Sequence, residues 1–210
     1  MYRSVGKESY PEALRQIAWV PTRLYYEGEI ALLANPRIIA VVGTRRMSEY
    51  GELVTRKLVR ELVARDWVIV SGLARGVDRV AHETCLANGG KTIAVLAHGL
   101  QMTYPPEHAD LRQRIVDSGG LIMSEHKEGI GLTKQNLAVR NRIVVAIAQC
   151  VLVTESPKSS GTKITVRFAA DQGKDVYVVP GPINDPTYEG SVELMRDGCI
   201  PIGKAEDIEF

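Results

Sequence analysis

Residues 67–82 constrain the fold more than any other stretch, because they combine a buried strand, a glycine-rich turn and a helix start in direct succession. Residues 67–70 are apolar without polar alternation, which is typical of a parallel strand covered on both faces. Gly72 and Gly76 allow backbone angles that other residues avoid, and the first amides of the following helix point back toward the turn. Together with Arg75, these amides are predicted to seat an anion. The alternative is an ordinary turn that requires glycine for its geometry alone.

Five more apolar runs predict strands that alternate with helical patterns along residues 36–210. Six strands joined by short loops indicate an α/β fold of the extended Rossmann-like, doubly wound type, with a mostly parallel sheet in a single domain. Residues 1–35 are punctuated by prolines and carry apolar anchors such as Trp19, and we expect them to form a lead-in packed along the sheet edge. The five runs are residues 37–42, 92–96, 121–123, 151–153 and 176–179.

The composition limits the kinds of ligand and compartment that fit the chain. Its 210 residues, 45% of them hydrophobic, suffice for one substantial core. Twenty-six basic and 25 acidic residues give a formal charge of +1, so an anion site must be a local cluster. The three cysteines are far apart and in no CxxC spacing, which disfavours disulfides and zinc and favours a reducing cytoplasm. No apolar run reaches the roughly 18 residues of a membrane helix, so we expect a soluble, unexported protein that does not bind membranes.

Cationic side chains gather where the predicted strands end, although the whole chain is nearly neutral. The carboxyl ends of parallel strands meet at one edge, and ligands of such sheets bind beyond that edge. The excess of cations therefore indicates a polyanionic or phosphate-bearing ligand, and the alternative is an ordinary solvated surface. The residues at these ends are Thr44, Arg45 and Arg46; Ser71, Gly72 and Arg75; His98; Glu125 and Lys127; Glu155, Lys158, Ser160, Gly161 and Lys163; and Asn184.

The sequence Arg140-Asn141-Arg142 introduces a helix that is apolar nearly all round, so we expect that helix to be central and buried. Charges that only solvate the surface would be easier to place elsewhere. Two guanidiniums and an amide in this position are suited to bind phosphate oxygens and base edges.

The usual signatures of cofactor binding and catalysis are missing. The chain has no GxGxxG, no GxxxxGK[ST] and no GxSxG motif, and its four histidines show neither i,i+4 pairing nor a cysteine partner. We therefore predict no cofactor, no metal and no catalytic residue, and interpret the histidines as capping or surface groups. Glu125 and Glu155 are the only credible acids, and we expect them to hold arginines such as Arg142 or to cap backbone donors.

Taken in order, the motifs resemble those of the DNA-processing protein A family (DprA or Smf), the single-strand DNA-binding recombinase loaders of bacterial transformation. The resemblance covers about residues 9–202. Each motif is weak alone, but seven in the family's order are specific. They are Val41-Val42-Gly43-Thr44-Arg45, Ser71-Gly72-Leu73-Ala74-Arg75-Gly76-Val77-Asp78 with Ala81-His82, Tyr104-Pro105, Ser124-Glu125, Arg140-Asn141-Arg142, Glu155 with Ser160-Gly161-Thr162, and Val179-Pro180-Gly181.

The resemblance implies an extended Rossmann domain whose DNA pocket lies on the carboxyl edge of the sheet. It implies single-stranded DNA as ligand, a RecA-type recombinase as partner, and a homodimer formed near the C-terminal end, where Val192 and Met195 share a helix face beside Ile200 and Ile202. Such a protein protects incoming DNA and assists recombinase loading in natural transformation. The positions that inherit a binding role are Gly43, Arg45, Arg140, Asn141, Arg142, Gly161 and Lys163.

The chain departs from the family pattern at several positions. Leu137-Ala138 stands where the family commonly has Phe-Pro, which removes an aromatic ring that stacks on a base. Ser159 replaces an arginine, and Lys163 adds a cation where an apolar residue is usual.

Two other functions remain open for the same edge. One is a sensor of a nucleotide-derived ligand held in a closed pocket. The other resembles the phosphoribohydrolases, which cleave the base from a nucleoside monophosphate and carry a PGGxGTxxE-like motif. Gly161-Thr162 is followed here by Lys163, Ile164 and Thr165, so the required acid is absent and hydrolysis is the weaker interpretation.

Overall fold

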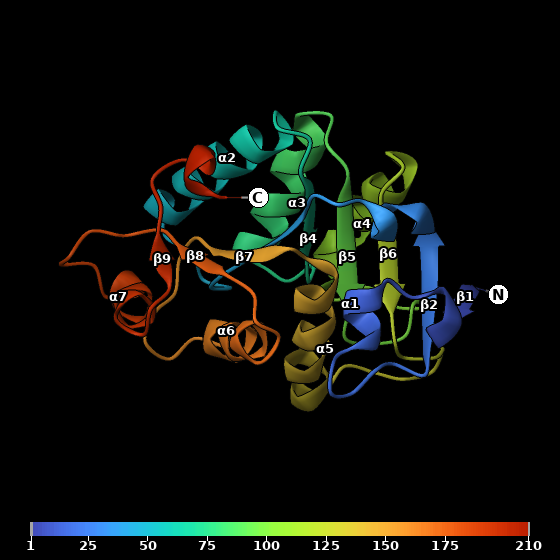
Figure 1. The fold of residues 1–210 in the computed structure, drawn as a ribbon. Helices are drawn as coiled ribbons and strands as arrows, with labels where there is room; N and C mark the ends of the chain where they lie inside the picture. The colour runs from blue at the N-terminus through green and yellow to red at the C-terminus, as the bar shows by residue number, and fades with distance from the viewer. Residues whose placement is uncertain (1, 210) are drawn as a thin grey trace.

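A nine-stranded sheet forms the centre of the part of the chain that this computed structural model describes, residues 2–209 (Figure 1). Its strand order is β1-β2-β6-β5-β4-β3-β7-β8-β9. Strands β3 to β9 run parallel, and β1 and β2 pair antiparallel at one edge. The strands are β1 (Arg3–Gly6), β2 (Arg23–Gly28), β3 (Ile38–Val42), β4 (Val68–Ser71), β5 (Thr92–Leu96), β6 (Leu121–Ser124), β7 (Cys150–Val153), β8 (Val176–Val178) and β9 (Ile200–Pro201).

Helices cover both faces of the sheet, as a doubly wound fold requires. The helices α1 (Glu12–Arg15), α5 (Lys134–Ile147), α6 (Thr162–Asp171) and α7 (Glu189–Arg196) pack on one face, and α2 (Glu49–Val63), α3 (Val77–Ala87) and α4 (Ala109–Asp117) on the other. Short 3₁₀ helices span Lys7–Ser9, Ile30–Ala34, Pro106–His108, Pro186–Tyr188 and Ala205–Asp207. Between residues 2 and 209, no helix combines the length and the apolarity that crossing a membrane demands.

The apolar runs of the sequence form the predicted parallel strands, because alternate side chains enter the two cores. Ile38 and Ala40 of β3 face the core that contains α5, whereas Ile39 and Val41 face the core that contains α2 and α3. The α/β architecture and the six predicted strands are therefore confirmed.

The lead-in is more regular than expected. Strand β2 pairs with β6 from Tyr25 opposite Ser124 to Gly28 opposite Leu121, and β1 pairs with β2. Leu24 and Tyr26 are buried while the residues beside them are exposed or half-exposed, so β2 has the alternating pattern of an antiparallel strand. The lead-in thus extends the sheet by two strands.

The strand order reverses at β3, which lies between β4 and β7. The turns after β3 and β7 are joined there, because the amide of Thr44 donates a hydrogen bond to the carbonyl of Glu155 at 3.0 Å. Ligands of doubly wound sheets bind at such a switch point, beyond the carboxyl ends of the strands. The fold therefore places the turns that carry Arg45 and Arg75 around one edge.

Gly76 connects the turns after β3 and β4. It has φ 72° and ψ −127°, and a Cβ atom there would lie 2.2 Å from the carbonyl oxygen of Thr44. The next amide, that of Val77, donates to the same oxygen at 3.1 Å. The glycine is required both by its backbone angles and by this close approach.

We predict that Gly76→Ala lowers the free energy of unfolding by about 3 kcal/mol or more, because the strained backbone costs about 1–2 kcal/mol and the clash displaces the turn after β3. Gly89→Ala is the matched control, since Gly89 has φ 73° and nothing within 4 Å of the added Cβ. Urea denaturation of both variants measures the difference. Equal losses of stability would contradict the close approach.

Candidate nucleic-acid interface

A cavity of about 270 Å³ lies over the carboxyl ends of β4 and β5. Its lining includes four arginines and no carboxylate, and Tyr104, Leu132 and Leu137 supply its apolar and aromatic walls. A concave site that combines cations with flat apolar surface suits a ligand with both phosphates and bases. The four arginines are Arg45, Arg46, Arg75 and Arg140.

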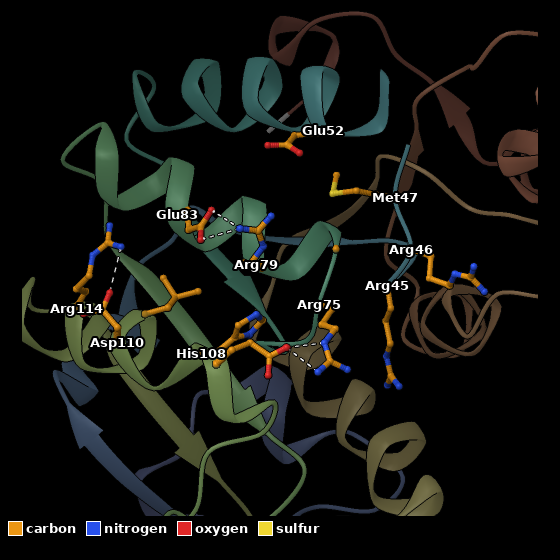
Figure 2. A pocket seen from close by; sticks show the side chains of 13 residues that line it. Arg45, Arg46, Met47, Glu52, Arg75, Arg79, Glu83, His108, Asp110 and Arg114 are labelled. Atoms are coloured by element: carbon orange, nitrogen blue, oxygen red, sulfur yellow. Dashed lines mark hydrogen bonds and ion pairs between the residues drawn. The ribbon is translucent and has the colours of Figure 1, made fainter. Parts of the chain in front are cut away.

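A larger cavity of about 550 Å³ adjoins it between α2, α3 and α4 (Figure 2). Its lining holds five arginines but also four carboxylates. Arg79 pairs with Glu83 at 3.2 Å and Arg114 with Asp110 at 3.6 Å, as Figure 2 shows. Because its charges nearly cancel, the smaller cavity is the stronger anion site.

Arg45 and Arg46 extend from the turn after β3 and line both cavities. Both are exposed, and their guanidiniums form no ion pair or hydrogen bond with any residue among 2–209. The hydroxyl of Thr44 accepts a hydrogen bond from the amide of Arg46 at 3.1 Å, which fixes the turn. These guanidiniums are therefore free to bind a ligand. Arg75, in contrast, pairs with Glu107 at 2.6 Å on the surface, a contact of little strength in water.

Arg140 lies beneath the smaller cavity and is buried. Its guanidinium donates to the carbonyl oxygen of Gly72 at 2.7 Å and to that of Val95, and its Nε donates to the side chain of Asn141 at 3.1 Å. Burial lowers the pKa of Arg140 to about 10, while the carboxylate of Asp78 raises it, so the side chain stays charged at neutral pH. It contributes a fixed positive charge to the cavity floor.

Arg142 does not have the free donors that a direct phosphate contact needs, which corrects the sequence prediction. Only 4% of the residue is exposed. Its terminal nitrogens donate to Glu125 at 2.6 Å each, and its Nε donates to the carbonyl oxygen of Trp19 at 2.8 Å. The predicted role of Glu125 as a holder of Arg142 is confirmed.

The amides of the turn after β4 are not an open anion seat either. The carboxylate of Asp78 accepts from the amides of Gly72 and Ala74 at 3.2 Å each, so the protein's own anion occupies them. Glu155 takes the corresponding place before α2, where it accepts from the amide of Ser48 at 3.0 Å and from its hydroxyl at 2.9 Å. Burial raises the pKa of Glu155, against these hydrogen bonds. Its predicted capping role is confirmed.

The remaining predicted residues lie outside both cavities. Ser71 is buried and donates to the carbonyl of Val41 at 2.7 Å, and Asn141 donates to Thr165 at 2.9 Å. Lys163 pairs with Glu193 at 2.6 Å. The other residues of this group are Gly43, Ser160 and Gly161.

The sequence predicts that the histidines are capping or surface groups. The surface part of this prediction is wrong for three of the four. His82, His98 and His108 are buried, and His126 is half-buried. His82 contacts the hydroxyl of Thr92 at 2.7 Å, and burial lowers its pKa to about 3. His98 lines the smaller cavity and His108 the larger one.

The family model of DNA recombination-mediator protein A matches residues 2–209. The chain belongs to that family. The DNA processing protein DprA of Bacillus subtilis is 36% identical over 204 residues, which are 97% of this chain and 68% of that protein.

Two solved structures from this family are similar to the chain. The X-ray structure of DNA processing protein A from Streptococcus pneumoniae has a TM-score of 0.92 at 35% identity and covers 100% of this chain and 75% of its own. The second structure is of DNA processing protein A from Helicobacter pylori and is described as giving insight into its single-stranded DNA binding mode. It has a TM-score of 0.88 at 31% identity, and the match covers 98% of this chain and 94% of that chain. The resemblance and the fold class predicted from the sequence are confirmed.

Tyr104, which lines the smaller cavity, belongs to the family's motifs but has no role in the predictions from the sequence. Tyr104 is 40% exposed and lines this cavity together with apolar residues such as Leu137. An aromatic residue followed by two prolines ahead of a helix was the available signal. Without the fold, nothing indicated that Tyr104 lines the same cavity as the arginines.

We predict that acid destabilises the protein through His82. Unfolded histidine has a pKa of about 6.5, and native His82 stays neutral to about 3, so the unfolded state binds one proton more as the pH falls below 6.5. Between pH 6.5 and pH 5 this proton removes about 1.5 kcal/mol of the free energy of unfolding. Burial also lowers the pKa of His98 and His126. The test therefore compares the slope of the free energy of unfolding against pH between the unaltered protein and a His82 variant. His82→Gln should have a shallower pH dependence in urea titrations, and an unchanged slope would refute the assignment.

Proposed function

We propose that this protein binds single-stranded DNA at the smaller cavity on the carboxyl edge of its sheet. The observation that carries the proposal is the lining of that cavity, where four arginines meet an exposed tyrosine without any carboxylate. Membership of the family supports it, since the relative from Helicobacter pylori is described as binding single-stranded DNA.

The division of labour follows from the contacts. Arg45 and Arg46 are exposed and receive phosphates, and Arg75 joins them by exchanging the carboxylate of Glu107 for a phosphate oxygen. Tyr104 and Leu137 receive a base, which stacks on the ring of Tyr104. A duplex is disfavoured because its bases are already stacked and paired.

A nucleotide sensor is the second candidate, and the occupied amides weigh against it. Small phosphorylated ligands of doubly wound folds use amides of the turns that lead into the helices, and here Asp78 accepts from the amide of Gly72 and Glu155 from that of Ser48. A phosphoribohydrolase requires an accessible acid, whereas Glu155 is buried and held by Ser48. We therefore infer a binding protein rather than an enzyme.

The wider role that we propose is the protection of incoming DNA and the loading of a RecA-type recombinase during natural transformation, in the cytoplasm. The free cysteines at positions 85, 150 and 199 suit a reducing compartment. The chain spans about two thirds of the Bacillus subtilis relative, and the recombinase step is proposed for the whole protein.

We also propose a homodimer near the C-terminal end. Ile183 is fully exposed, and Ile164 of α6 and Ile200 of β9 are exposed beside the half-buried faces of Val192 and Met195. Ile202, expected on the same surface, is buried against the other core.

Arg45→Ala should weaken the binding of a labelled oligodeoxynucleotide by roughly tenfold, because a charge-assisted contact to a phosphate is lost. For single strands the logarithm of the binding constant falls with the logarithm of salt by about 0.7 per neutralised phosphate, so the slope should flatten by about that amount. Fluorescence anisotropy at several salt concentrations measures both quantities.

Arg60→Ala is the control for this experiment. Arg60 is an exposed arginine of α2 about 16 Å along the helix from its first residue, and thus away from the carboxyl edge. Equal effects of the two substitutions, or competition by duplex as strong as by single strand, would move the site away from this cavity. Tight binding of free nucleotides alone would favour the sensor.

The dimer is tested by light scattering at high micromolar concentration, where twice the chain mass is expected. Ile183→Glu should restore the monomer mass, because it places a charge in an apolar contact. A monomer mass for the unaltered protein would remove the dimer proposal.

A further inference from the structure

Trp19 is exposed in a segment that is otherwise anchored. The sequence predicts that Trp19 is an apolar anchor. This prediction is wrong, because 65% of the residue is exposed. Its neighbours Ile17 and Pro21 are buried, and Val20 packs against the core. The backbone is thus held on both sides while the indole faces solvent.

The backbone of Trp19 is fixed by a buried ion pair. Nε of Arg142 donates to the carbonyl oxygen of Trp19 at 2.8 Å, and the Arg142 and Glu125 side chains are only 5% and 16% exposed. Removing such a pair from water is costly, so its geometry is tightly defined. A single exposed apolar side chain is ordinary by itself, as Leu53 on α2 shows with 66% exposure. Trp19 differs because the buried side chain of Arg142 holds its backbone carbonyl.

The backbone of Trp19 is anchored at the same edge as the smaller cavity. Glu125 directly follows β6, whose Ser124 lies opposite Leu96 of β5. The residues after Leu96, Ala97 and His98, line the cavity. Neighbouring strands are about 4.8 Å apart, so Glu125 follows a strand end about one spacing from the strand end that lines the cavity. Arg142 links Glu125 to the carbonyl of Trp19.

We propose that Trp19 is a second stacking surface, on which a base of the bound single strand lies after the strand leaves the smaller cavity. This inference rests on the proposed DNA binding. An indole offers a large rigid π face, which accepts any base and requires no hydrogen bond. Arg142 is then a positioning residue, which acts through the carbonyl of Trp19 and not through a phosphate.

Tryptophan emission tests the proposal directly, because the chain has two tryptophans and the other, Trp67, is 4% exposed. Adding a thymidine oligonucleotide should quench the emission of the unaltered protein and leave that of Trp19→Phe unchanged. In parallel, anisotropy of a labelled oligonucleotide should give an affinity roughly tenfold lower for Trp19→Ala, and close to the original for Trp19→Phe. Leu53→Ala is the matched control and should bind as the unaltered protein does.

The two readouts separate the two proposals. If the oligonucleotide binds with unchanged emission, and Trp19→Ala keeps full affinity, the stacking surface is refuted while DNA binding stands. If the unaltered protein binds no oligonucleotide, the proposed function itself fails. If Leu53→Ala loses as much affinity as Trp19→Ala, the loss reflects general surface change and the stacking surface is again refuted.

Discussion

The guanidinium of Arg140 holds the carboxyl edge together. It reaches from α5 to the carbonyl oxygens of Gly72 and Val95, and so ties one helix to the turn after β4 and to β5. A side chain at Gly72 has no room, because a Cβ there would lie 2.2 Å from that guanidinium. The position of the Arg140 guanidinium therefore requires glycine at residue 72. The same guanidinium gives the cavity above it a positively charged floor.

Carboxylates of the protein occupy the positions where other doubly wound folds hold phosphates. Asp78 fills the turn after β4, and Glu155 fills the start of α2 at the switch point. Both turns are thereby rigid without a ligand. The amides of Gly72, Ala74 and Ser48 are therefore taken, and we propose that an anion binds through the guanidiniums of Arg45 and Arg46, which line the smaller cavity. Such an arrangement suits an extended chain of phosphates better than a single enclosed one.

The sequence was informative where one physical signal dominates. Buried parallel strands are continuously apolar, so runs such as residues 37–42 predicted the sheet. Strands β1 and β2 were missed because an antiparallel strand such as Arg23–Gly28 alternates and contains a glycine and charges. In the site, the convergence of Arg45 and Arg75 followed from the strand ends, and Arg140 was indicated by its place in Arg140-Asn141-Arg142, ahead of a buried helix. The fate of individual donors did not, because the pairing of Asp78 with the turn and of Arg142 with Trp19 depends on distances that only the fold supplies.

The central claim is that a single strand lies in the smaller cavity between Tyr104 and the arginines, and photochemical crosslinking tests it most directly. A thymidine oligonucleotide that carries 5-iododeoxyuridine reports the aromatic residues next to its bases after irradiation and peptide mapping. The account predicts crosslinks in the peptide that contains Tyr104, with loss of that crosslink in Tyr104→Leu. Crosslinks confined to peptides away from the carboxyl edge, with Tyr104 unmodified, would contradict it.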